Sequence, residues 1–182
     1  MTDALNDAGS SGAARRIVAT PVGDVTLRSQ TPADASFLFD LFCARHAPMF
    51  AAAGLPAAAL SDLLASQYGL RCADYRTKFP RARWSVIEAA GGPIGELIED
   101  DEPDAVYIMD ITVLAARQAR GIGSAIVRAL MAANAARGGV RAMAIVTNEI
   151  SIRMFQRLGF AMARHEGDAY VSLRWRPPAA QG

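Results

Sequence analysis

Three strand-like segments follow one another in the middle of this chain, and only short turns separate them. Residues 84–90 and 94–99 flank the turn at 91–93, and the acidic residues 100–104 form a second turn before the longest segment, 105–113. Turns this short join antiparallel neighbours, because a parallel connection needs a crossover of about a dozen residues or more. The sequence therefore predicts an antiparallel meander at the centre of the protein.

Helical patterns lie on both sides of this meander. Thr31 and Pro32 form a helix-start signal, and apolar residues at helical spacing indicate a second helix around residues 60–68. Further elements are expected at residues 25–28, 121–137, 141–146, 149–158 and, as a hairpin across a turn at 166–168, at 160–164 and 169–175. Their order predicts an α/β fold in which helices flank a mixed, mostly antiparallel sheet.

The length of 182 residues fits a single domain with a substantial core. We expect this domain over residues 17–176, with a flexible tail at 1–16 and a short tail at 177–182. Residues 1–14 contain no apolar segment of signal-peptide length, so a cytoplasmic protein is the expectation.

The composition narrows the range of partners. Hydrophobic residues make up 52% of the chain, charged residues 20%, and the net charge is +1. These values favour a globular protein and give no reason to expect a nucleic-acid or membrane partner. Cys43 and Cys72 lack metal-ligand spacing, so no metal site is expected; free thiols are favoured over a single disulfide.

The most informative motif is a glycine turn at residues 118–124, between the third strand of the meander and a long helix. Gly121 and Gly123 permit close approach of a ligand, and a helix start offers unpaired N–H groups to a pyrophosphate. Glycines also serve packing alone at such turns. A Rossmann site is disfavoured because an antiparallel meander precedes the turn and Ile126 occupies the third glycine position, and no P-loop Gly-Lys-Ser/Thr follows.

Two motifs together resemble the GNAT superfamily of N-acetyltransferases. Gln118-x-x-Gly121-x-Gly123 is similar to the family's acyl-CoA signature, Gln/Arg-x-x-Gly-x-Gly/Ala. Residues 148–160, which read Asn-x-x-Ser-x-x-Met-Phe-x-x-Leu-Gly-Phe, resemble its second segment, usually Asn-x-x-Ala-x-x-Leu-Tyr-x-x-x-Gly-Phe. The resemblance extends from about Val25 to Trp175 and implies a GNAT fold.

The resemblance implies that acetyl-CoA binds in a cleft beside the central strand. Its pyrophosphate would contact the glycine turn, and its pantetheine arm would pair with the strand end as a surrogate strand. The residues expected to contact it are Ile111, Thr112, Val113, Gln118, Ala119, Arg120, Gly121, Ile122, Gly123, Ser124, Asn148, Ser151 and Phe155.

Attack of an amine on a thioester requires a proton acceptor. Asp110 is one candidate because it interrupts an otherwise apolar strand; the alternatives are a structural carboxylate paired with an arginine or with backbone amides, and an anchor for a substrate ammonium. Glu96 and Glu99, on the neighbouring strand, are further candidates, although solvated side chains are the expectation there. Asp110 and Glu96 are the predicted catalytic pair.

Two features bear on the acceptor and the leaving group. The acidic residues 99–104 suit a solvated hairpin tip, or else a preference for cationic substrates. Phe155 occupies the position where the family usually has tyrosine, which often serves as general acid, so either another donor acts or the thiolate leaves unassisted.

The resemblance favours direct acetyl transfer to a primary amine in a ternary complex. The acceptor would be a small-molecule amine or a peptide, and a homodimer stays open. Two alternatives remain: a non-catalytic acyl-CoA-binding module, and an acetyltransferase for protein N-termini or lysines.

Overall fold

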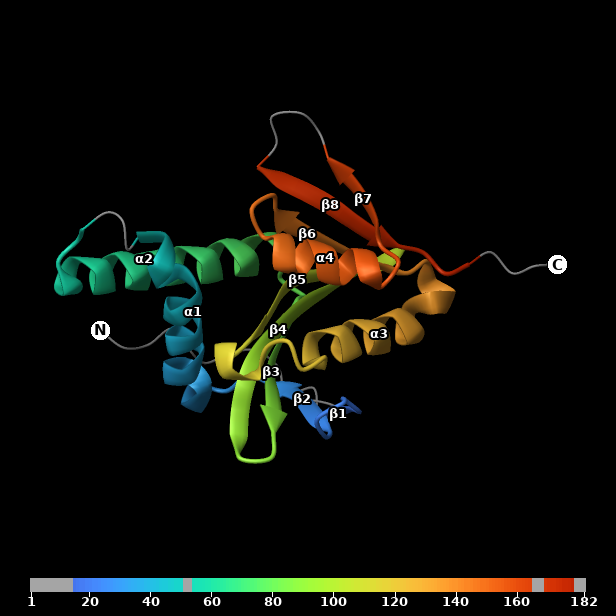
Figure 1. Ribbon diagram of the computed structural model, residues 1–182, viewed down its shortest axis with the longest axis horizontal. Helices are drawn as coiled ribbons and strands as arrows, with labels where there is room; N and C mark the ends of the chain where they lie inside the picture. Colours follow the sequence, from blue (N-terminus) through green and yellow to red (C-terminus); the bar gives the residue numbers. More distant parts are fainter. Residues whose placement is uncertain (1–14, 51–53, 165–168, 179–182) are drawn as a thin grey trace.

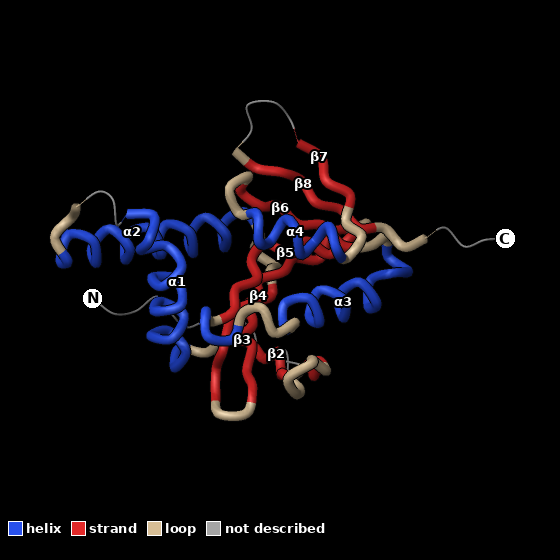
Figure 2. Tube along the Cα trace, viewed as in Figure 1, coloured by secondary structure: helices blue, strands red, loops and turns tan. Residues whose placement is uncertain are grey.

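The computed structural model describes residues 15–50, 54–164 and 169–178. Its strands form one sheet in the order β1-β2-β3-β4-β5-β6-β8-β7 (Figures 1 and 2). The strands are β1 Arg16–Val18, β2 Val25–Ser29, β3 Arg83–Ala89, β4 Gly92–Glu102, β5 Ala105–Val113, β6 Val140–Ile145, β7 Ala161–Arg164 and β8 Tyr170–Trp175. Within this sheet β5 and β6 are parallel and the other pairs are antiparallel, which confirms the predicted mixed, mostly antiparallel α/β architecture.

Helices cover both faces of the sheet (Figure 2). Helices α1 (Ala35–Phe50) and α2 (Ala57–Lys78) contact the face that carries Glu96, whereas α3 (Ile122–Asn134) and α4 (Glu149–Arg157) cover the opposite face. Short 3₁₀ turns lie at η1 Pro32–Asp34, η3 Ala115–Arg117 and η4 Ala135–Arg137. Cys43 and Cys72 are free thiols on α1 and α2.

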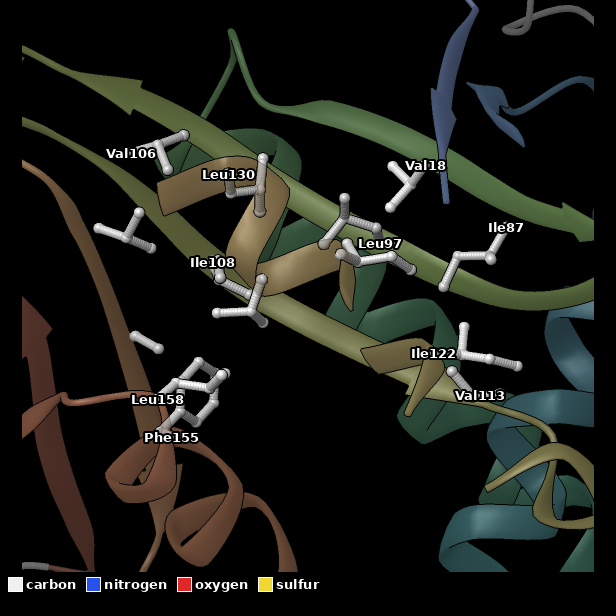
Figure 3. Packing of buried hydrophobic residues seen from close by; sticks show 14 of the residues in the cluster. Val18, Ile87, Leu97, Val106, Ile108, Val113, Ile122, Leu130, Phe155 and Leu158 are labelled. Carbon is white, nitrogen blue, oxygen red and sulfur yellow. The ribbon is translucent and has the colours of Figure 1, made fainter. Parts of the chain in front are cut away.

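The main apolar core lies between the sheet and helices α3 and α4 (Figure 3). Ile122 and Leu130 of α3 pack there with Leu97 of β4 and Ile108 of β5, and Phe155 of α4 joins them. Burial of this apolar stripe holds the glycine turn at the start of α3 against the end of β5.

A β-bulge reverses the alternation of side chains along β5. Ile98 of β4 pairs with Asp110, but the next residue, Glu99, pairs with Ile108, so Met109 is an extra residue. Ile108 therefore faces the core under α3, whereas Asp110 faces α1 and α2. Bulges re-aim side chains in this way because one added residue shifts the two-residue period.

The expected turn at residues 100–104 is wrong. β4 continues as a strand to Glu102, and only Pro103 and Asp104 turn the chain into β5. Arginines pair with Glu99, Asp101 and Glu102, so this part of the acidic run is not a solvated tip, whereas Pro103 and Asp104 are exposed. The ion pairs are Glu99 with Arg16 and Arg83, Asp101 with Arg83 and Arg137, and Glu102 with Arg141.

Other boundaries shift by smaller amounts. α2 is longer than the pattern around residues 60–68 indicated, and β1 was not expected from the sequence. The expected turn at 166–168 lies outside the described residues, as do residues 1–14 and 179–182 of the expected tails.

Candidate active site

The parallel strands β5 and β6 separate part-way along their length. They pair only between Val106–Ile108 and Val140–Ala142. Beyond Ile108 the edge of β5 that faces β6 has no strand partner among the described residues, so its backbone groups are available to a ligand.

A cavity of about 650 Å³ occupies the space that this separation opens. We call it the large cavity; its volume lies within the range usual for small-molecule sites. Its lining comes from the end of β5, η3, the glycine turn, α4 and one face of α1. It therefore joins residues that are far apart in the chain, from Leu41 to Arg157.

The glycine turn presents unpaired donors to this cavity. Gly121 has φ 80°, a left-handed conformation that favours glycine, and Pro21 packs against it where a side chain would project. Ala119 also has a positive φ, 58°. The first helical bond of α3 runs from Ala125 N to Gly121 O, and in the described part of the chain the N–H groups of residues 122–124 have no backbone acceptor. Such a cluster of donors at a helix start suits a phosphate group.

Two polar side chains fix the loops around the cavity. The amide nitrogen of Gln118 donates to the carbonyl of Val113 at 2.8 Å, which ties the glycine turn to the end of β5. The side-chain oxygen of Asn148 accepts from the N–H of Ser151 at 3.2 Å and caps α4. Gln118 and Asn148 thus position the lining, in addition to forming part of it.

The structure brings most of the expected cofactor-contacting residues together. Those that line the large cavity are Ile111, Thr112, Val113, Gln118, Ala119, Gly121, Ile122, Gly123, Ser124, Asn148 and Ser151. Arg120 and Phe155 are not part of this lining. Phe155 is only 2% exposed and packs edge-on against Phe160, while its neighbour Met154 faces the cavity.

A second, much smaller hollow adjoins the large cavity, and we call it the polar hollow. Leu41, Arg45 and Thr112 line both spaces. The remaining residues of the polar hollow are Phe42, His46, Arg71, Glu96 and Asp110. The two acids chosen from the sequence, Glu96 and Asp110, therefore lie side by side next to the strand end.

Arginines bind both of these acids. Arg71 contacts Glu96 Oε2 at 2.7 Å and Asp110 Oδ2 at 3.0 Å, and Arg45 contacts Asp110 Oδ1 at 2.9 Å. Glu96 also accepts from Gln30 at 2.8 Å. The expectation that Glu96 is solvated is wrong, because it is only 4% exposed; Glu99, which is fully buried, lines neither space.

The two carboxyls differ in their proton affinity. Burial raises the pKa of Glu96 above its ordinary value, and nearby Asp110 adds to this, although Arg71 opposes it. Burial also acts on Asp110, but Arg45, Arg71 and a hydrogen bond from Thr112 outweigh it and lower the pKa of Asp110. Glu96 is consequently the better proton acceptor of the two.

Three residues of the polar hollow were missed from the sequence: Arg45, His46 and Arg71. His46 stacks on Phe42 with ring centroids 4.1 Å apart, and burial and Arg45 lower its pKa, which keeps the imidazole neutral near pH 7. Phe42 and His46 are four residues apart, a spacing that places both on one side of a helix. This spacing could have indicated that His46 packs against Phe42, but it could not show that this side of α1 faces β5.

The comparisons with known proteins agree with this geometry. Residues 59–160 match the model of the acetyltransferase (GNAT) family, and this match spans more than half of the chain. The chain belongs to the GNAT acetyltransferase family. No curated protein matches the sequence.

Solved acetyltransferases share the fold. An acetyltransferase from Thermus thermophilus is 21% identical, with a TM-score of 0.58 over 83% of this chain and 96% of its own. The PaiA N-acetyltransferase of Thermoplasma acidophilum, solved with coenzyme A, is 10% identical, with a TM-score of 0.59 over 83% and 99%. RimJ of Mycobacterium smegmatis, in complex with CoA-disulfide, is 18% identical, with a TM-score of 0.57 over 88% and 84%.

Two further features are absent from the described residues. No helix among them combines the length and apolarity needed to cross a bilayer. No group of three or more His, Cys, Asp or Glu side chains among them is arranged to hold a metal ion.

Proposed function

We propose that this protein is an N-acetyltransferase that moves the acetyl group of acetyl-CoA to a primary amine. The observation that carries the proposal is the junction of two spaces at Thr112. On one side lies the large cavity with its phosphate-binding turn, and on the other lies a buried acid of raised pKa, Glu96. Family membership and the CoA complexes of PaiA and RimJ support the same donor.

The residues of the large cavity fit acetyl-CoA. The N–H groups of residues 122–124 suit a pyrophosphate, and Arg117 and Arg157 add positive charge to the same lining. Gly123 has no side chain, which leaves space for the ligand between the glycine turn and α4. A Cβ at this position would lie 3.4 Å from the sulfur of Met154. The open edge of β5 beyond Ile108 suits the two amide groups of a pantetheine arm.

When bound, acetyl-CoA supplies a thioester whose acetyl carbon accepts the amine and whose sulfur leaves as a thiolate. Glu96 accepts the proton that the acceptor ammonium must lose before it attacks, because its raised pKa brings it closer to neutrality. The second proton leaves the nitrogen for solvent once the C–N bond has formed and the C–S bond has broken. Asp110 holds Arg45 and Arg71 in place. Transfer is direct, in a ternary complex, as membership of the family implies.

The thiolate leaves without help from residue 155. Phe155 lies in the core and has no acidic proton. A thiol has a pKa of about 8.5, so its conjugate base is stable enough to depart unprotonated near neutral pH. The unusual phenylalanine is therefore compatible with turnover.

The proposal is tested by a screen for CoA release from acetyl-CoA over polyamines, amino acids, aminoglycosides and peptides. Amine-dependent release that accompanies a new acetylated product supports it. Binding of acetyl-CoA without release for any amine would favour the alternative of a non-catalytic acyl-CoA-binding module. Release only with peptides or proteins would instead favour acetylation of N-termini or lysines.

A further inference from the structure

The charged side chains around the large cavity all have the same sign. In the described lining they are Arg45, Arg117 and Arg157, and it includes no aspartate or glutamate. The two acids of the adjoining polar hollow, Glu96 and Asp110, are both paired with arginines. A polycationic acceptor would therefore find no unpaired carboxylate here, whereas an anionic group would be attracted.

Arg45 has a different position from the other two arginines. Arg117 belongs to η3 beside the glycine turn, and Arg157 ends α4. Arg45 projects from α1 and is the arginine that lines both the large cavity and the polar hollow. It therefore stands where an acceptor would meet the acetyl group, away from the phosphate-binding turn.

The guanidinium of Arg45 is fixed on one side and open on the other. Its Nη1 donates to Asp110 Oδ1 at 2.9 Å and to Thr112 Oγ1 at 2.7 Å. Within the described part of the chain its Nε and Nη2 have no hydrogen-bond partner, and its side chain is 40% exposed. Nε and Nη2 form one edge of the guanidinium, which matches the two oxygens of a carboxylate.

We propose that the acceptor is an amine that also carries a carboxylate, as an amino acid does, and that this carboxylate binds to Nε and Nη2 of Arg45. The inference rests on the proposed acetyltransferase function and names its substrate class. Asp110 acts as the positioning residue, because it holds the guanidinium plane from the opposite side. Apolar contacts for the rest of the acceptor come from Leu41 and Ala44 on the same face of α1.

The test compares free amino acids with their primary amides, which differ only at the carboxylate. kcat/KM is measured for each pair at fixed acetyl-CoA and corrected for the fraction of unprotonated amine. We expect the wild type to prefer the acids by about tenfold to hundredfold, the range that charge-assisted hydrogen bonds supply. Arg45→Gln should bring the ratio close to one.

Two further variants make the test specific. Arg45→Lys keeps a positive charge beside Asp110 but lacks the planar edge, so its ratio should also fall. Arg157→Gln removes a cavity arginine that does not line the polar hollow; its KM for acetyl-CoA should rise while the acid-to-amide ratio stays at the wild-type value. Thermal stabilisation of the CoA complex by acids but not amides gives the same comparison without turnover.

The outcomes separate this inference from the proposed function. If the wild type acetylates amides or polyamines as well as acids, the inference is wrong and the acetyltransferase proposal stands. If the ratio is unchanged in folded Arg45→Gln, Arg45 is not the carboxylate anchor. If acetyl-CoA binds but no amine is acetylated, both proposals fail together.

Discussion

Glu96 and Asp110 both form an ion pair with Arg71, yet their pKa values shift in opposite directions. Asp110 has a second guanidinium, Arg45, and its pKa is lowered, whereas burial dominates at Glu96 and its pKa is raised. A carboxyl that is tied on both oxygens by cations makes a poor base. The difference in pKa between the two acids therefore follows from which of them lies between two arginines.

We predict that Glu96→Gln lowers kcat by about a hundredfold or more, a usual contribution of general-base catalysis, while the Kd for acetyl-CoA changes little. The rate of the wild type should increase as pH rises through the raised pKa of Glu96, because the base works only when deprotonated. Stopped-assay kinetics across pH, with isothermal titration of acetyl-CoA, check both points.

The matched control for this variant is Asp74→Asn. It also removes a carboxylate, but Asp74 is on the outside of α2, paired with Lys78, and lines neither space. Its turnover should stay within about twofold of wild type, as expected for a surface change. A folded Glu96→Gln protein that keeps full turnover would exclude Glu96 as the base and make His46 the next candidate.

At the scale of elements, a partly buried ion pair fixes the position of α1. Arg28 of β2 binds Asp34 through two hydrogen bonds of 2.8 and 2.7 Å, and Asp34 also accepts from the N–H and hydroxyl of Thr31. Asp34 thus joins β2 to the start of the helix that carries Arg45. These contacts, led by the hydrogen bond from Arg28, lower the pKa of Asp34 well below its ordinary value.

We predict that Asp34→Asn destabilises the protein by about 1–3 kcal/mol, because the half-buried Arg28 loses its charged hydrogen-bond acceptor and keeps only the longer contact to Glu88 at 3.4 Å. The sign of the pH dependence follows from the lowered pKa. The stability that Asp34 contributes is complete above the unfolded-state pKa of about 3.9 and is lost as pH falls toward the lower folded-state pKa. Urea unfolding of both proteins between about pH 3 and 6 should show a smaller pH dependence in the variant; parallel curves would contradict this role.

Local patterns predicted most elements, and tertiary contacts explain the misses. The Thr31-Pro32 signal, the meander and the glycine turn involve neighbours in sequence, so they could be recognised without the fold. Glu102 remains in β4 because Arg141, 39 residues away, neutralises it, and no local pattern contains that information. Arg45 and Arg71 were missed for the same reason: their acids lie on another layer of the structure.

At the scale of the whole molecule, binding and folding are linked through α3. The helix contributes Ile122 and Leu130 to the core and N–H groups to the large cavity, so a ligand held at its start stabilises the folded state alone. A ligand at about a hundred times its Kd adds about 2.7 kcal/mol to the free energy of unfolding. In a domain of this size, each kcal/mol corresponds to a Tm shift of roughly 2–4 °C.

We predict that saturating acetyl-CoA raises the Tm of the wild type by about 5–10 °C. Gly123→Val should remove the shift, because its side chain would contact Met154 and enter the space in front of the donor groups. Differential scanning fluorimetry with and without acetyl-CoA measures this directly. Gly69→Ala, in α2 with open space around it, is the control and should keep the full shift; an unchanged shift in Gly123→Val would exclude the glycine turn as the phosphate site.

The bulge at Met109 sets which face of the sheet each residue of β5 beyond Ile108 occupies. If β5 paired with β4 without this bulge, Met109 would take a regular place in the ladder, and residues 110 and 112 would exchange faces with 111 and 113. The carboxylate of Asp110 would then face the apolar core under α3, and isoleucine would face Arg45 and Arg71. The chain would still contain every amino acid of the polar hollow, yet the hollow would be gone. In this family member the active site depends on the phase of a strand as much as on the residues that the strand contains.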